Sequence, residues 1–262
     1  MYMLRAPQRV HLDVGQVLPR LRWVLGQVAL VLLGVLVYFG VRGLTEGSTS
    51  LAREHAYDIV DLERALGIDV EAELQRLVAP SETMQTVANW IYIWGHWPAI
   101  IATMIWLVWL HRDVFLLLRD AMMVSGLLGM VVFVSYPVAP PRLAHLGLVD
   151  TVTEQSRAYR VLQPPAFVNQ YAAMPSLHSG WDLLVGLAII AAASSVALRI
   201  VGFAMPVLMA FAVVATANHY IVDVVAGVAL ALVGHAVALH LEQRRRRRRS
   251  RPRHPLRQSR GD

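Results

Sequence analysis

Six long apolar runs alternate with polar connections along this chain of 262 residues. A helix of roughly 17–25 apolar residues crosses the hydrocarbon core of a bilayer, and each run reaches that length. The spans are expected near residues 23–41, 87–110, 121–138, 180–198, 200–217 and 220–241. The pattern predicts an all-α integral membrane protein with six transmembrane helices, in which Arg199 marks a tight hairpin between the fourth and fifth.

One polar stretch, residues 46–86, carries nine acidic residues together with a helical apolar repeat. Breaks are expected near Gly67 and Pro80. We expect one or two amphipathic helices on the outer face, forming a solvated cap, with a substrate lid as the alternative. The apolar positions of the repeat are Ile59, Leu62, Leu66, Val70, Leu74 and Leu77.

The distribution of arginine predicts the orientation in the membrane. With the N-terminus in the cytoplasm, the inner segments hold seventeen Arg and the outer segments seven, and ten of the seventeen fall within residues 244–260. This bias follows the positive-inside rule. Both termini are therefore expected in the cytoplasm of a multi-pass cell-membrane protein. The loop at 139–178 and the corner at 218–219 then share the extracytoplasmic face.

Composition supports this class, because 56% of residues are hydrophobic and 16% are charged, against about 25% charged in soluble domains. The chain has no Cys, which excludes disulfides and thiol chemistry. The expected units are a cytoplasmic tail (1–22), a first span with the cap (23–86), a five-helix catalytic core (87–241) and a basic cytoplasmic tail (242–262). The basic tail is interpreted as a topology anchor for anionic lipid, in preference to a nucleic-acid-binding segment.

Three ionisable residues fall inside or beside the apolar runs, where such groups are costly unless they are paired or used. His219 and Asp223 are four residues apart, so on a helix the carboxylate can orient the imidazole. The pair is typical of a histidine nucleophile, His219, oriented by a carboxylate, Asp223. The alternative is that the two residues form only a structural hydrogen bond between helices. His178 follows a Pro-Ser turn at the start of the fourth span, where a general acid would reach the same face.

Two further residues on that face can contact phosphate. Ser176 and the neighbouring amides precede a helix N-terminus, which favours anions. Arg142 offers a guanidinium fork that matches phosphate oxygens, although it can also be an interfacial residue whose charge extends to water. A metal site built from the two histidines and Asp223 lacks a second carboxylate cluster, so no metal or cofactor is expected there.

Three segments resemble the type-2 phosphatidic acid phosphatase superfamily, namely Tyr136–Arg142, Asn169–His178 and Asn218–Asp223. Within it they look closest to the branch of inositol phosphorylceramide synthases and their bacterial relatives. The resemblance covers residues 87–241. It implies a six-helix core and metal-independent transfer through a phosphohistidine or similar intermediate. Carried over by position, it makes His219 the nucleophile, Asp223 its partner, His178 the general acid, and Ser176 and Arg142 phosphate contacts. Separately from the resemblance, Asp182, Asn218 and Tyr220 are expected to support these residues without contacting the substrate.

The chain departs from that pattern at several positions. Leu177 replaces the usual Gly, Ala212 and Val213 replace a Ser-Arg pair, and Pro141 precedes Arg142 where a Pro usually follows it. Asp182 lies four residues after His178, so it is expected either to raise the pKa of that imidazole or to tether a neighbouring helix. Asn89, Tyr92 and His96 recur at helical spacing, and interfacial packing is favoured there over a head-group pocket.

The expected function is a membrane phosphatase or phosphotransferase acting on a lipid phosphate or lipid-linked phosphodiester. Water as the second acceptor gives hydrolysis, and an alcohol gives transfer, including inositol-phosphate transfer. The alternative is a non-catalytic lipid-binding or transport protein that retains the fold. A transporter is expected to show internal repeats and paired interrupted helices, and the sequence shows neither.

Overall fold

The computed structural model describes residues 14–44, 48–152 and 170–250, and every named element in them is helical. Asn169, the first residue of the second motif, lies outside the described residues. The helices in chain order are α1 (Val14–Leu44), α2 (Thr49–Leu66), α3 (Glu71–Val78), α4 (Glu82–Trp94), α5 (Trp97–Leu110), α6 (Arg112–Ser135), the short 3-10 helix η1 (Pro141–Leu143), α9 (Leu177–Ala192), α10 (Val196–Ala215) and α11 (Ile221–Ser250).

Within the described residues, four helices are long and apolar enough to cross a membrane: α1, α6, α10 and α11. The pair α4 and α5 makes a fifth if it counts as one span, bent by 42°. The remaining apolar helix, α9, has 16 residues and so extends about 24 Å, which is less than a full bilayer core. The chain is therefore a helical membrane protein, and its described residues contain four or five helices of spanning length.

Two boundaries differ from the sequence prediction. The span expected at 87–110 is interrupted, because Pro98 lacks an N–H and disfavours helical geometry before it, so α5 starts anew after His96. The break between the fourth and fifth runs is not at Arg199. Ser195 caps α10 by accepting the Leu198 N–H (3.3 Å), and Arg199 lies inside the first turn of α10.

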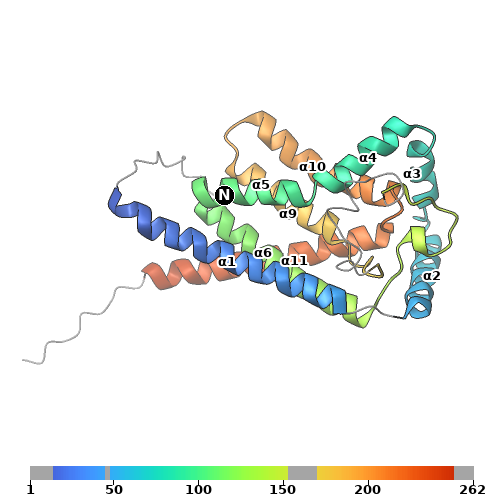
Figure 1. Ribbon diagram of the computed structural model, residues 1–262, viewed down its shortest axis with the longest axis horizontal. Helices are drawn as coiled ribbons and strands as arrows, with labels where there is room; N and C mark the ends of the chain where they lie inside the picture. Colours follow the sequence, from blue (N-terminus) through green and yellow to red (C-terminus); the bar gives the residue numbers. More distant parts are fainter. Residues whose placement is uncertain (1–13, 45–47, 153–169, 251–262) are drawn as a thin grey trace, which may run out of the picture.

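The helix α9 lies at the centre of the bundle and packs against α10, α11 and α6. Its buried face carries Trp181, Leu184 and Val185, and the Trp181 indole N–H donates to Ser125 Oγ of α6 (3.1 Å). Figure 1 shows α2 and α3 at one end of the bundle and both ends of the described chain at the other. The connections that carry the sequence motifs therefore share the end covered by α2 and α3.

Helices α2 and α3 occupy the segment for which a cap is expected, and we refer to them as the cap; the breaks in this segment agree with the prediction. Gly67 ends α2 in the left-handed conformation (φ +70°), and Pro80 separates α3 from α4. Of the apolar positions in the repeat, Ile59 is buried, whereas Leu62, Leu66 and Leu77 are exposed. The buried residues include two carboxylates, and they are Ala52, Ala56, Ile59, Val60 and Glu63 on α2 and Glu71, Gln75 and Val78 on α3.

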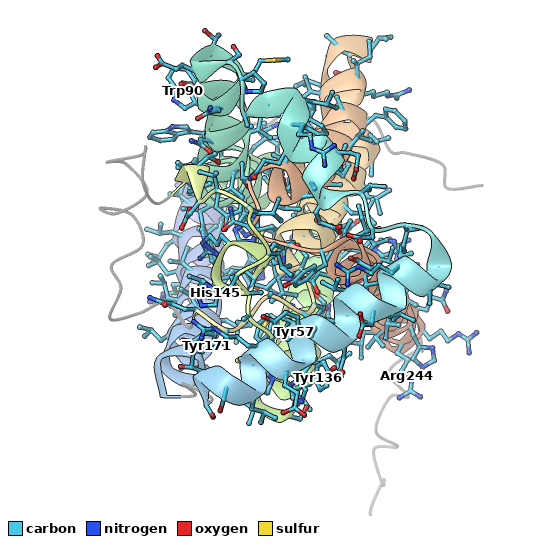
Figure 2. All side chains as sticks on the ribbon, turned by 90° about the vertical axis from the view of Figure 1, so that its right-hand side faces the viewer. Tyr57, Trp90, Tyr136, His145, Tyr171 and Arg244 are labelled. Atoms are coloured by element: carbon cyan, nitrogen blue, oxygen red, sulfur yellow. The ribbon has the colours of Figure 1, made fainter. Side chains whose placement is uncertain are left out.

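The cap helix α2 crosses over the loop that follows α6 and holds it by polar contacts. Tyr57 donates its hydroxyl hydrogen to the Ala144 carbonyl (3.1 Å), and His55 Nδ1 lies 2.8 Å from the Pro137 carbonyl oxygen. The His55 ring also stacks on Tyr136, with ring centroids 3.9 Å apart. Figure 2 shows Tyr57 and Tyr136 together beside α2. Helix α2 thus holds the loop that carries the first motif, Tyr136–Arg142.

At the opposite end, the Arg run begins as a continuation of α11. Arg245 pairs with Asp120 of α6 (2.7 Å), which also accepts from Arg119. Part of the basic run is therefore used in packing α11 against α6. The rest of the basic tail, from residue 251, lies outside the described residues.

Candidate active site

The corner between α10 and α11 fixes His219 through its backbone. The Val213 carbonyl accepts N–H groups from both Asn218 and His219 (3.0 Å each), and Ala217 adopts the left-handed region (φ +56°) to allow this. The Asn218 amide donates to Thr216 Oγ1 (2.9 Å) and so stabilises the turn. Asn218 therefore supports the corner, as the sequence suggested, by holding the backbone that precedes His219.

Asp223 orients His219 from the first turn of α11. Its Oδ2 lies 3.3 Å from His219 Nδ1 and accepts the Tyr220 backbone N–H (3.0 Å), and the residue is fully buried. A proton on Nδ1 that is donated to this carboxylate leaves the Nε2 lone pair available for attack. The Tyr220 hydroxyl donates to the Ala139 carbonyl (3.1 Å), which joins the corner to the Arg142 loop.

The start of α9 brings His178 to the same place. Ser176 caps α9 by accepting the Ser179 N–H (3.4 Å), and its own N–H donates to the Asp223 carbonyl (2.9 Å). The ring centroids of His178 and His219 are 5.7 Å apart. Two segments separated by about forty residues thus place both imidazoles and the carboxylate in one cluster. The Ser176 hydroxyl is buried beside Ser179 Oγ (3.3 Å), so its contact with phosphate stays a prediction.

The expected link between Asp182 and His178 is wrong. Asp182 Oδ1 lies 2.9 Å from His96 Nδ1, and both residues are buried. The imidazole of His96 lies against that of His178 (ring centroids 4.2 Å apart), and Tyr92 stacks on His178 (4.6 Å). The alternative that Asp182 tethers a neighbouring helix is the one the structure supports, because this bond ties α9 to the start of α5.

His96 and Tyr92 therefore contact a candidate site residue, whereas their sequence pattern favours interfacial packing. Their spacing places them on one helical face, but nothing in that spacing indicates His178 as their partner. Asn89, the third residue of that series, bonds to Thr151 through its amide (2.8 Å) and so holds the loop after η1. The bend before Pro98 is what turns His96 toward α9.

Arg142 lies beside the catalytic corner, as the motif suggested. Its backbone N–H donates to the Ala217 carbonyl (3.1 Å), two residues before His219. Its guanidinium Nε donates to Asp150 Oδ2 (3.0 Å), and 9% of its side chain is exposed. The interpretation as a residue extending to the membrane interface is not supported, because the side chain is buried and paired. The Asp150 carboxylate offsets part of the charge that Arg142 can offer to a phosphate.

The cap supplies two carboxylates to the first turn of α11. Glu63 Oε1 accepts the Val222 N–H (2.7 Å) and Glu71 Oε1 accepts the Ile221 N–H (3.0 Å), so these groups satisfy amides that a helix N-terminus leaves unpaired. Burial, together with the neighbouring Glu71, raises the pKa of Glu63 to about 8. Burial also raises the pKa of Glu71. With Asp69, these carboxylates form a group whose oxygens suit a hard metal ion.

The arrangement combines an oriented imidazole, a second imidazole nearby and an arginine whose backbone is bonded to the same corner. An imidazole with a free Nε2 can attack phosphorus, and a second imidazole can protonate a leaving oxygen. The amides at the start of α9 and the charge of Arg142 favour an anion nearby. The cluster is thus equipped for transfer of a phosphoryl group between two oxygen atoms.

Comparison with protein families agrees with this geometry. The family model of the PAP2 superfamily matches residues 57–237, which runs from the middle of α2 into α11 and includes every site residue described above. No curated protein and no solved structure matches the chain. Since the family match covers well over half of the sequence and contains both histidines with Asp223, the chain belongs to the PAP2 superfamily.

Proposed function

We propose that this protein is a membrane-embedded phosphatase or phosphotransferase that acts on lipid-linked phosphate through a covalent intermediate on His219. Membership of the PAP2 superfamily suggests phosphatase-type chemistry. The observation that carries the proposal is the single cluster formed by His178, His219 and Asp223, with imidazole centroids 5.7 Å apart and a buried carboxylate behind the nucleophile.

In the first half-reaction, His219 Nε2 attacks the phosphorus of the substrate. The bond from phosphorus to the lipid oxygen breaks, and the departing oxygen takes a proton from His178, so a lipid alcohol leaves and a phosphohistidine remains. The carboxylate of Asp223 stabilises the positive imidazole as it forms. Arg142 and the Ser176 turn are the proposed contacts for the equatorial phosphate oxygens.

In the second half-reaction, an incoming hydroxyl attacks the same phosphorus and the P–N bond to His219 breaks. His178, now neutral, accepts the proton of that hydroxyl and returns to its starting state. With a phosphomonoester substrate, water gives inorganic phosphate and an alcohol gives a new monoester. With a phosphodiester substrate, water gives a monoester and an alcohol gives a new diester, as in the inositol-phosphate transfer of the synthase-like branch.

Support around the histidines comes from Asp182 and His96. The Asp182–His96 bond fixes the orientation of the His96 ring, which in turn lies against His178 together with Tyr92. His178 is thereby packed against two rings, which limits the conformations from which it can donate its proton. Such preorganisation is a recognised contribution to catalytic rate.

The proposed setting is the outer leaflet of the cell membrane, with both termini in the cytoplasm and anionic lipid near the basic tail. The arginine bias supports this orientation. The structure is compatible with it, since the start of α1 and the end of α11 lie at the end of the bundle opposite α2 and α3 (Figure 1). A lipid substrate would then enter laterally from the bilayer toward the corner beside His219.

Turnover by purified protein tests the proposal. A panel of polyprenyl phosphates, phosphatidic acid and a phosphoinositide is incubated with wild-type protein and with His219→Gln, and the products are separated. We expect turnover of at least one lipid by the wild type and a loss of several orders of magnitude in the variant. Equal rates for the two proteins would overturn the role of His219. Inactivity of the wild type toward all lipids, with retained lipid binding, would favour a non-catalytic lipid-binding or transport protein.

The role of His178 is tested by changing the leaving group. A lipid alkoxide needs protonation as it leaves, whereas p-nitrophenolate needs little. His178→Ala is therefore expected to lose much more activity on the alkyl phosphate than on the aryl phosphate, while His219→Gln loses both. Equal losses for His178→Ala on the two substrates would show that His178 binds phosphate and does not donate the proton.

A further inference from the structure

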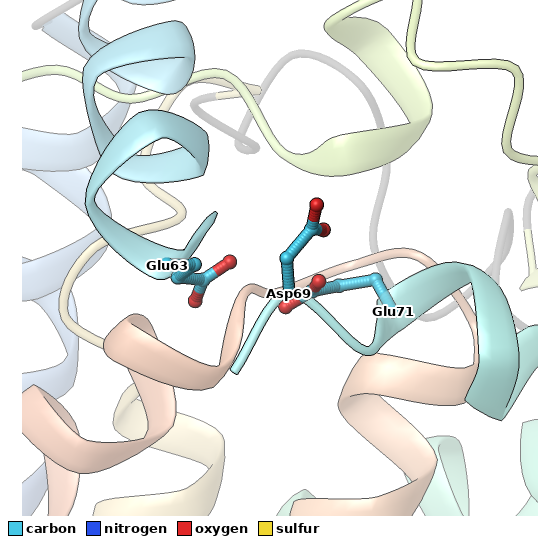
Figure 3. A group of neighbouring side chains, drawn as sticks. All are labelled: Glu63, Asp69 and Glu71. Carbon is cyan, nitrogen blue, oxygen red and sulfur yellow. The ribbon is translucent and has the colours of Figure 1, made fainter. Parts of the chain in front are cut away.

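Three carboxylates from the cap gather directly behind the catalytic corner. Glu63 ends the buried face of α2, Asp69 lies in the connection after Gly67, and Glu71 begins α3. One oxygen from each lies within 4.8 Å of the others. Figure 3 shows Glu63 and Glu71 reaching toward each other from opposite sides, with Asp69 between them.

The charge of this group is not balanced by the basic side chains around it. Glu63 is fully buried, and its Oε2 has no hydrogen-bond partner within the described part of the chain. Arg64 pairs with Asp69 (3.1 Å) and with Asp61 (3.5 Å), and no ion pair among the described residues joins a basic side chain to Glu63 or Glu71. Buried carboxylates this close together require either a shared proton or a cation.

We propose that Glu63, Asp69 and Glu71 bind a divalent cation of the calcium type. Calcium takes oxygen ligands at about 2.3–2.6 Å, so two ligands of one ion can be up to about 5 Å apart, which accommodates the observed oxygens. Magnesium, which binds at about 2.0–2.1 Å and usually through one or two carboxylates, suits the group less well. The buried, unpartnered Glu63 Oε2 supplies a ligand atom that the fold leaves without another use.

The surroundings offer a route for the ion and further ligands. The Asp69 side chain is 37% exposed, so an ion can enter from solvent on that side and keep several water molecules. The Oε1 atoms of Glu63 and Glu71 accept the first amides of α11, so the ion would join the cap to the helix that carries Asp223. Its role is structural, because the ion would not contact the reacting atoms, and the inference is independent of the proposed reaction.

Terbium luminescence tests the site without relying on activity. Protein in detergent is stripped with EDTA, transferred to phosphate-free buffer and titrated with Tb³⁺, with excitation of tyrosine and tryptophan. We expect saturable emission that Ca²⁺ displaces at about 0.1–1 mM, the range of exposed sites with few ligands, and that Mg²⁺ displaces less effectively. Addition of 10 mM Ca²⁺ to the stripped protein is expected to raise the thermal midpoint by a few degrees.

Matched variants locate the signal. Glu63→Gln keeps an amide oxygen for the Val222 N–H but loses the negative charge. Asp69→Asn removes the charge at an exposed position, where folding tolerates the change. Each variant is expected to weaken Tb³⁺ and Ca²⁺ binding at least tenfold. Glu73→Gln is the control, because Glu73 is exposed and pairs only with Arg76 (3.7 Å) in the described structure. Absence of saturable emission in the wild type, or equal binding by wild type and Asp69→Asn, would overturn the proposal. A midpoint that responds to pH and not to Ca²⁺ would indicate a shared proton instead.

Discussion

Substitution of Gly227 by alanine is expected to separate α9 from α11 at the catalytic cluster. A Cβ atom on Gly227 would lie 2.7 Å from the carbonyl carbon of Ser176 and 3.1 Å from its nitrogen. Ordinary carbon contacts are about 3.5–4.0 Å, so the two backbones must move apart by roughly 1 Å. The atoms in the way are backbone atoms of the turn before His178, so no side-chain rotation relieves the contact.

The magnitude follows from two opposing effects. Alanine in a helix is favoured over glycine by about 1 kcal/mol, while overpacking typically costs about 1–3 kcal/mol. We therefore expect a net loss of about 0–2 kcal/mol in stability. Activity should fall much further, because a misplacement of about 1 Å between reacting groups costs on the order of 100-fold in rate. The Gly227→Ala variant thus separates an effect on alignment from an effect on folding.

The assay compares kcat and the thermal midpoint of Gly227→Ala with those of Gly34→Ala. A Cβ on Gly34 of α1 has no atom within 4 Å, so this control is expected to keep its activity and to gain up to about 1 kcal/mol in stability. Wild-type kcat in Gly227→Ala would refute the reasoning, because it would mean that the Ser176 turn and α11 are not in close contact in the active protein. A kcat that falls only in proportion to the unfolded fraction would refute it too.

Asp182→Asn should lower kcat on the order of 10-fold to 100-fold while the protein stays folded, because a neutral amide oxygen holds the His96 ring less firmly than the carboxylate does. An unchanged kcat and pH profile would limit Asp182 to helix packing. The thermal midpoint in EDTA should fall as pH rises from about 4.5 to about 8 and then level off. In this range Glu63, with a pKa of about 8 in the folded protein, keeps a proton that the same side chain in the unfolded chain loses near its ordinary pKa of 4.5. Glu63→Gln should reduce that dependence, and an identical pH slope in the variant would contradict it. Single Cys probes should react with an impermeant reagent at Ser48 in intact cells and at Ser250 only after permeabilisation; labelling of Ser250 from outside would invert the proposed orientation.

The local geometry around the candidate site could be predicted because it is encoded in short patterns. The i,i+4 spacing of His219 and Asp223 and the Pro-Ser turn before His178 each predict a local geometry that the structure contains. The meeting of these segments could be expected once both were assigned to the same end of the bundle. The catalytic roles of these residues stay a prediction, because the family match over residues 57–237 shows the superfamily alone.

Contacts between distant helices were not predictable in the same way. Helical spacing placed Asp182 on the face of His178, but it could not show that the bend after α4 delivers His96 to the same carboxylate. Similarly, the charges of Glu63 and Glu71 indicated a solvated face. They are buried because they accept backbone N–H groups at the start of α11, which would otherwise be unpaired. Since α11 begins about 150 residues later in the sequence, no local pattern around Glu63 or Glu71 indicates their burial.

Isolation of the phosphorylated enzyme tests the central claim most directly. Purified protein is mixed with a substrate labelled with ³²P in its phosphate, quenched in alkali within milliseconds to seconds, digested and mapped by mass spectrometry. The account predicts a phosphopeptide modified at His219 that forms and decays at rates compatible with turnover and is absent from His219→Gln. Sustained turnover with no phosphoenzyme at any time, or phosphate found on another residue, would contradict it.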